Sequence, residues 1–102
     1  MVIALQYRLA VMGFLYFPEP EEGQKYSGNW GIQDQTIALE WGNKYAPHFG
    51  GDISERTITG CSAGGMSVFL HLTIEDSWPY FDRAVPTGIG LILSDSKEVG
   101  TV

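Results

Sequence analysis

The pentapeptide Gly-Cys-Ser-Ala-Gly at residues 60–64 is the part of the sequence whose residue types and spacing best fit covalent chemistry. A serine with a glycine two positions away on each side is typical of a sharp turn from a strand into a helix. Glycine is needed there because neighbouring backbone comes too close for a Cβ atom. We expect such a turn to expose the hydroxyl group of Ser62 as a nucleophile. The N–H group of Ala63, at the positive end of the following helix, would donate to a developing oxyanion.

A second interpretation makes Ser62 the N-cap of a glycine-rich helix start. The flanking sequence favours the strained turn. Residues 56–60 alternate and include β-branched side chains, which indicates a short strand. Residues 63–72 are apolar almost all round, which predicts a buried helix over this range.

Other segments supply the elements that must position this turn. Residues 2–7 form a nearly continuous apolar run, typical of a strand buried on both faces of a parallel sheet. Asp34 is expected to open a helix whose apolar residues recur at helical spacing, and Pro47 to end it. Residues 83–87 predict a third strand, which Pro86 confines to an edge or a strand end. The alternation of strands and helices predicts an α/β fold, with residues 2–7, 56–60 and 83–87 as adjacent parallel strands joined by crossover helices.

The N-terminal segment also has the outline of a secretory leader, because Arg8 precedes an apolar run over residues 9–17. No small-residue cleavage site follows this run, so we favour the strand. The run is too short for a transmembrane helix, which needs about 20 residues. We therefore expect no membrane segment in this chain.

Composition narrows the classes of function. The chain has 102 residues, a formal charge of −6 and 44% hydrophobic residues, which indicates one small globular domain at most. The acidic balance and the absence of a Lys/Arg cluster argue against nucleic acid as a partner. A single cysteine, Cys61, cannot form an internal disulfide.

Several motifs together resemble the type-B carboxylesterase and cholinesterase family. They are Tyr-Arg-Leu-Ala-Val-Met-Gly-Phe-Leu at 7–15, Asn-Trp-Gly-Ile-Gln-Asp-Gln at 29–35, Phe-Gly-Gly-Asp at 49–52, Thr-Ile-Thr-Gly-Cys-Ser-Ala-Gly-Gly at 57–65 and Phe-Asp-Arg-Ala at 81–84. The resemblance implies an α/β-hydrolase fold and hydrolysis of small carboxylic esters by a Ser, Glu or Asp, His triad. It implies no metal or organic cofactor. It also implies a secreted, cell-surface or endoplasmic reticulum location, while the oligomeric state stays open.

Residue by residue, the resemblance makes Ser62 the nucleophile and Ala63 the oxyanion donor, on an elbow built by Gly60, Gly64 and Gly65. It also makes Arg8 and Asp34 candidates for a buried ion pair beneath the site. The alternative is that both charges are separately solvated.

The chain departs from the family pattern at several positions. Cys61 stands where the family usually has Glu, and we interpret it as a small buried side chain. Ala10 replaces the usual Gly, the loop at 18–28 is longer than typical, and the tail at 91–102 no longer follows the family. Residues 1–102 are therefore expected to be a fragment of one α/β-hydrolase domain, about a fifth of a family member.

Neither histidine fits the role of triad base. His71 follows Ser62 by nine residues, which displaces it by about 13 Å along one helix, whereas a base must lie within roughly 3 Å. His48 precedes the serine and is expected to lie on the surface. We therefore expect the triad acid and histidine, and the family's glycine-rich oxyanion loop, to lie outside this chain.

Two classes of function stay open. The first is a serine ester hydrolase with an acyl-enzyme mechanism in the complete protein. The second is a non-catalytic neuroligin-like adhesion relative, or an inactive truncated product. Because the family's adhesion members lack the serine, Ser62 among its glycines favours the hydrolase.

Overall fold

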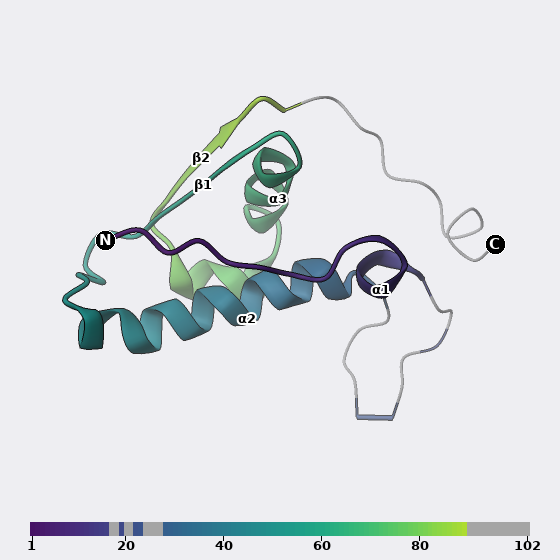
Figure 1. Cartoon of the computed structure of the whole chain (residues 1–102), viewed down its shortest axis with the longest axis horizontal. Coiled ribbons are helices and arrows are strands. Elements are labelled where there is room, and N and C mark those ends of the chain that lie inside the picture. The colour runs from purple at the N-terminus through teal and green to yellow at the C-terminus, as the bar shows by residue number, and fades with distance from the viewer. Residues whose placement is uncertain (17–18, 20–21, 24–27, 90–102) are drawn as a thin grey trace. The chain divides into compact units, whose positions relative to one another are not determined.

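The computed structural model describes residues 1–16, 19, 22–23 and 28–89 (Figure 1). Its elements are α1 (Ala10–Phe14), α2 (Trp30–Tyr45), the 3-10 helix η1 (Ala46–Phe49), β1 (Thr57–Cys61), α3 (Ala63–His71), the 3-10 helix η2 (Glu75–Tyr80) and β2 (Arg83–Thr87). The chain divides into two compact units. One contains Met1–Ala4 and residues 36–89, and the other contains the described part of Leu5–Gln35.

The two strands and the helix between them form one parallel βαβ unit. β1 and β2 pair in parallel, in a register that runs from Thr57 opposite Arg83 to Cys61 opposite Thr87. α3 connects them and packs against both strands (Figure 1). The α/β fold with a crossover helix is therefore confirmed, as are the strands expected at 56–60 and 83–87, the first shifted by one residue. Pro86 lies one residue from the end of β2, as expected for a residue without an N–H group.

The prediction of a strand at residues 2–7 is wrong for the described structure. No regular secondary structure is assigned there, and the sheet of the described residues contains only β1 and β2. Val2 is 94% exposed. Apolar and β-branched residues favour an extended backbone, but a strand exists only where a neighbouring strand accepts and donates its hydrogen bonds. Part of the apolar run at residues 9–17 forms the short helix α1.

α2 begins at Trp30, four positions before the predicted start at Asp34. Gly28 and Asn29 have φ angles of 76° and 53°, so the backbone immediately before Trp30 is left-handed. The Asn29 carbonyl accepts a hydrogen bond from the N–H group of Gln33 at 2.9 Å and so starts the helical pattern. The helix ends at Tyr45, two residues before Pro47, as the sequence predicts.

The expected burial of the helices is only partly confirmed. On α3, Val68 is 5% exposed, but Phe69 and Leu70 are 50% and 40% exposed. On α2, Ile37 and Trp41 belong to the apolar spacing of the sequence and are also largely exposed. The reason for α3 is geometric: it packs mainly against β1 and β2, and side chains on its other faces stay exposed.

None of the described helices is long and apolar enough to cross a membrane. The expectation for the tail at 91–102 falls outside the described residues, as does most of that for the loop at 18–28.

Candidate active site

Ser62 occupies a strained backbone conformation at the junction of β1 and α3. Its φ and ψ angles are 56° and −117°, a region that residues other than glycine rarely adopt. An N-cap residue instead has an extended backbone and accepts a hydrogen bond through its side chain. Ser62 makes no side-chain capping hydrogen bond. Its geometry is therefore that of a sharp strand-to-helix elbow with an exposed serine, as the elbow interpretation predicts.

Two of the three elbow glycines are sterically required. A Cβ atom on Gly60 would lie 2.5 Å from the carbonyl carbon and oxygen of Gly64, and one on Gly65 would lie 2.3 Å from the carbonyl oxygen of Thr87. Gly64 differs, since a Cβ atom there would meet nothing within 4 Å. The expectation that neighbouring backbone leaves no room for a Cβ atom on Gly64 is thus wrong for the described residues. The crowded position is Gly60, because the space for its Cβ atom is taken by the backbone of Gly64.

Ala63 is the first residue of α3 and lies at the end of the helix where N–H groups have no intrahelical acceptor. The helical pattern begins three residues later, where the N–H group of Met66 donates to the Ser62 carbonyl at 2.9 Å. Within the described residues, the Ala63 N–H group therefore lies at the positive end of the α3 dipole. This arrangement suits stabilisation of an oxyanion that develops next to the Ser62 hydroxyl.

Cys61 is an exposed free thiol, so the interpretation of this residue as a buried side chain is wrong. It is the last residue of β1, where side chains alternate between the two faces of the strand and the burial pattern leaves both ends exposed.

His71 is buried at the C-terminal end of α3. It is 3% exposed, and its Nδ1 atom lies 2.8 Å from the hydroxyl oxygen of Ser77, which is fully buried. Ser77 in turn lies 3.0 Å from the hydroxyl oxygen of Thr36 on α2. Burial lowers the pKa of His71 below its ordinary value. The histidine therefore joins the C-terminal end of α3 to η2 and α2.

His48 lies in η1, is exposed and contacts the ring of Tyr45, with 6.0 Å between the ring centres. The structure thus brings neither histidine of the chain into a hydrogen bond with Ser62 within the described residues. It also holds no group of three or more His, Cys, Asp or Glu side chains that could bind a metal in this part of the chain.

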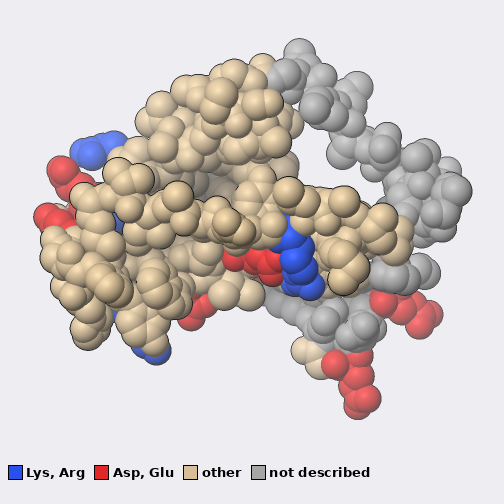
Figure 2. Space-filling view, in the orientation of Figure 1, with Lys and Arg blue, Asp and Glu red and all other residues tan. Residues whose placement is uncertain are grey.

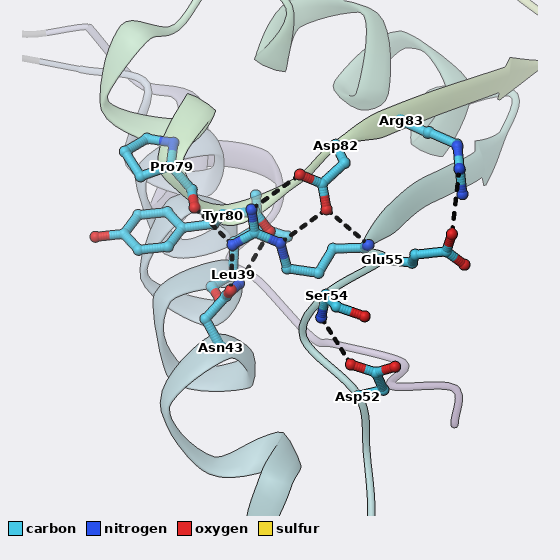
Figure 3. A network of polar contacts seen from close by, with 10 residues as sticks. Leu39, Asn43, Asp52, Ser54, Glu55, Pro79, Tyr80, Asp82 and Arg83 are labelled. Carbon is cyan, nitrogen blue, oxygen red and sulfur yellow. Dashed lines mark hydrogen bonds and ion pairs between the residues drawn. The ribbon is translucent and has the colours of Figure 1, made fainter.

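Arg56 forms a polar network that the sequence did not reveal (Figure 3). Its guanidinium group makes two hydrogen bonds with the carboxylate of Asp82, at 3.0 and 3.1 Å. It also donates to Asn43 Oδ1 at 2.6 Å and to the Pro79 carbonyl at 2.7 Å. Hydrogen bonds from Arg56 lower the pKa of Asp82 to about 2. The network joins α2 and η2 to the residues that directly precede β1 and β2, the two strands beside the elbow.

Arg8 and Asp34 form the predicted ion pair, but it is not buried. Two guanidinium nitrogens of Arg8 lie 2.8 Å from the two carboxylate oxygens, and the Arg8 backbone N–H donates at 3.0 Å. The Arg8 side chain is 51% exposed and that of Asp34 is 21% exposed. Hydrogen bonds from Arg8 lower the pKa of Asp34, and those to Asp34 raise the pKa of Arg8.

On the face that Figure 2 shows, most described side chains are uncharged and the Lys and Arg side chains do not gather into a patch.

The sharp turn at Ser62 and the parallel βαβ unit define the chain as an α/β protein with a serine at a strand-to-helix elbow. The model of the carboxylesterase family matches residues 1–94. Acetylcholinesterase 1 of Caenorhabditis elegans is 43% identical over 84 residues, which cover 82% of this chain and 13% of that protein. Cocaine esterase of Oryctolagus cuniculus is 41% identical over 106 residues, covering 99% and 19%. Pyrethroid hydrolase Ces2a of Mus musculus is 40% identical over 102 residues, covering 96% and 18%.

The chain belongs to the carboxylesterase family, and its fold is part of the α/β-hydrolase fold of that family. It spans between 13% and 19% of the length of these three relatives.

Proposed function

We propose that this chain carries the nucleophile of a carboxylic ester hydrolase, with Ser62 in that role. The observation that carries the proposal is the backbone of Ser62, which has a positive φ of 56° and no capping hydrogen bond. A strained conformation of this kind is costly, and it persists where the surrounding structure imposes it, commonly at reactive sites. Membership of the carboxylesterase family supports the same reading.

In the proposed reaction, the Ser62 hydroxyl oxygen attacks the carbonyl carbon of a small carboxylic ester. A general base takes the hydroxyl proton and passes it to the leaving alcohol. The N–H group of Ala63 donates to the oxygen that becomes negative in the tetrahedral intermediate. Collapse of the intermediate leaves the acyl group on Ser62, and water then releases the acid.

The base in this proposal is not one of the chain's own histidines. His71 is bonded to Ser77 in the interior, and His48 lies in the separate turn η1. The base, its carboxylate partner and the remaining oxyanion donors would come from segments that the relatives carry beyond the matched region. No metal or organic cofactor enters the proposed reaction.

A chimaera tests the proposal, because it supplies those segments. The whole chain replaces the matching segment of cocaine esterase of Oryctolagus cuniculus, with which it is 41% identical. We expect the chimaera to hydrolyse 4-nitrophenyl acetate and the Ser62→Ala variant to lose about 10⁵- to 10⁶-fold in kcat. Turnover that survives Ser62→Ala would contradict the proposal. So would a chimaera that unfolds cooperatively, and is thus folded, but shows no turnover, a result that favours the adhesion reading.

A further inference from the structure

Thr87, the last residue of β2, contacts the elbow on both sides of Cys61. Its carbonyl oxygen accepts a hydrogen bond from the N–H group of Ser62 at 3.0 Å. Its side-chain hydroxyl donates to the carbonyl oxygen of Gly60 at 2.9 Å. One residue of the neighbouring strand therefore holds the residue two positions before the nucleophile and the backbone of the nucleophile itself.

Contacts with the start of α3 add to this constraint. A Cβ atom on Gly65 would lie 2.3 Å from the Thr87 carbonyl oxygen and 3.2 Å from the Gly60 carbonyl oxygen. The backbone of α3 is thus pressed against the two oxygens that Thr87 aligns. Movement of Thr87 away from Gly60 would let the start of α3, and with it the Ala63 N–H group, shift relative to the serine.

We propose that Thr87 is a positioning residue for Ser62, and that its hydroxyl group holds the elbow in the strained conformation that reactivity requires. This inference rests on the proposed function for its effect on activity. Its structural part stands separately, because the conformation of the Ser62 backbone can be measured without a reaction. Displacements of about 1 Å in an active site can lower a rate by about 100-fold. Loss of one hydroxyl group at this position can therefore lower kcat.

The chain offers a matched control on the opposite strand. The Thr59 hydroxyl donates to the Val85 carbonyl at 3.0 Å. Like the bond from Thr87, this is a hydrogen bond from a threonine hydroxyl to a carbonyl of the other strand, but it lies two residues before the end of β1. Thr59 and Thr87 are both threonines of the same two-stranded sheet, and only Thr87 bonds to the elbow. Replacement of either by valine removes a hydroxyl group and keeps the branched shape.

The test compares Thr87→Val, Thr87→Ser and Thr59→Val in the chimaera with 4-nitrophenyl acetate. We expect Thr87→Val to lower kcat by about 10- to 100-fold with little change in KM. Thr87→Ser should keep kcat within threefold of the parent, because serine retains the donor. Thr59→Val should lower the melting temperature about as much as Thr87→Val but leave kcat within threefold.

Three results would overturn the inference: a Thr87→Val variant within threefold of the parent kcat, no rescue by serine, or an equal loss of kcat in Thr59→Val. Amide hydrogen exchange in the 102-residue chain supplies a readout besides activity. Thr87→Val should speed exchange of the Ser62 amide more than Thr59→Val does, and equal rates would refute the structural part. If the parent chimaera is inactive, the proposed function fails, and this exchange measurement still decides the structural claim.

Discussion

Gly60 and Gly64 approach each other so closely that a Cβ atom on Gly60 would lie 2.5 Å from the carbonyl carbon and oxygen of Gly64. The reverse does not hold, since a Cβ atom on Gly64 would meet nothing within 4 Å. The elbow therefore depends on its glycines unequally, and this inequality can be measured.

Gly60→Ala and Gly64→Ala form a matched pair. We expect Gly60→Ala to lower the free energy of unfolding by about 1–3 kcal/mol, as overpacking against backbone does. Gly64→Ala should instead raise it by up to about 1 kcal/mol, because alanine is the better helix former. Chemical denaturation of the 102-residue chain measures both values. Equal destabilisation by the two substitutions would show that Gly60 is not crowded against the backbone of Gly64.

The burial of His71 predicts that the folded chain loses stability as the pH is lowered. Because burial lowers the pKa of His71 in the folded chain, the unfolded chain binds more protons once the pH falls below about 6.5. The contribution of neutral His71 is complete near pH 7 and is lost as the pH falls toward 5. Denaturation midpoints over this range test the prediction.

His71→Gln should flatten the pH dependence between pH 7 and 5, since it removes the titrating group. His48→Gln is the matched substitution at the other histidine of the chain, which is exposed. A slope that persists in His71→Gln would mean that another group is responsible.

Arg56 should matter more for stability than the neighbouring Arg83. The Arg56 guanidinium bonds to Asp82, Asn43 and Pro79 together, a geometry that one ammonium group cannot reproduce. Arg83 pairs with Glu55 at 3.6 Å, and both side chains are mostly exposed. We therefore expect Arg56→Lys to lower the melting temperature clearly and Arg83→Lys to leave it nearly unchanged. Similar shifts in both variants would argue that the network contributes little.

The sequence predicted the elbow well because its determinants are local. A serine among glycines, a β-branched strand before it and an apolar helix after it are all contiguous with Ser62, so spacing alone indicates the turn. β1 and β2 were found for the same reason. The start of α2 was missed because it depends on left-handed backbone at Gly28 and Asn29, which side-chain periodicity does not reveal.

Features that depend on distant partners were not predictable. The strand expected at residues 2–7 requires a neighbour for its hydrogen bonds, and no described strand pairs with it. The Arg56 network joins residues 26 and 13 positions apart, and nothing in the sequence singles out Asp82 or Asn43 as its partners. The contacts of Thr87 cannot be predicted from the sequence, because they follow from the register that places it opposite Cys61.

The isolated 102-residue chain should not hydrolyse an activated phenyl ester above background. A serine hydroxyl without a base is a poor nucleophile at neutral pH, and neither His48 nor His71 is placed to act on Ser62. Release of 4-nitrophenol is the measurement. A burst or turnover that Ser62→Ala abolishes would show that the chain contains a base that these contacts do not reveal.

The most direct test of the account is covalent labelling of Ser62 by a fluorophosphonate probe in the chimaera, with the site located by mass spectrometry. We expect one adduct, on the Ser62 hydroxyl oxygen, with the probe's fluoride displaced and labelling absent in Ser62→Ala. A folded chimaera that takes up no probe, or one labelled equally after Ser62→Ala, would contradict the assignment of Ser62 as the nucleophile.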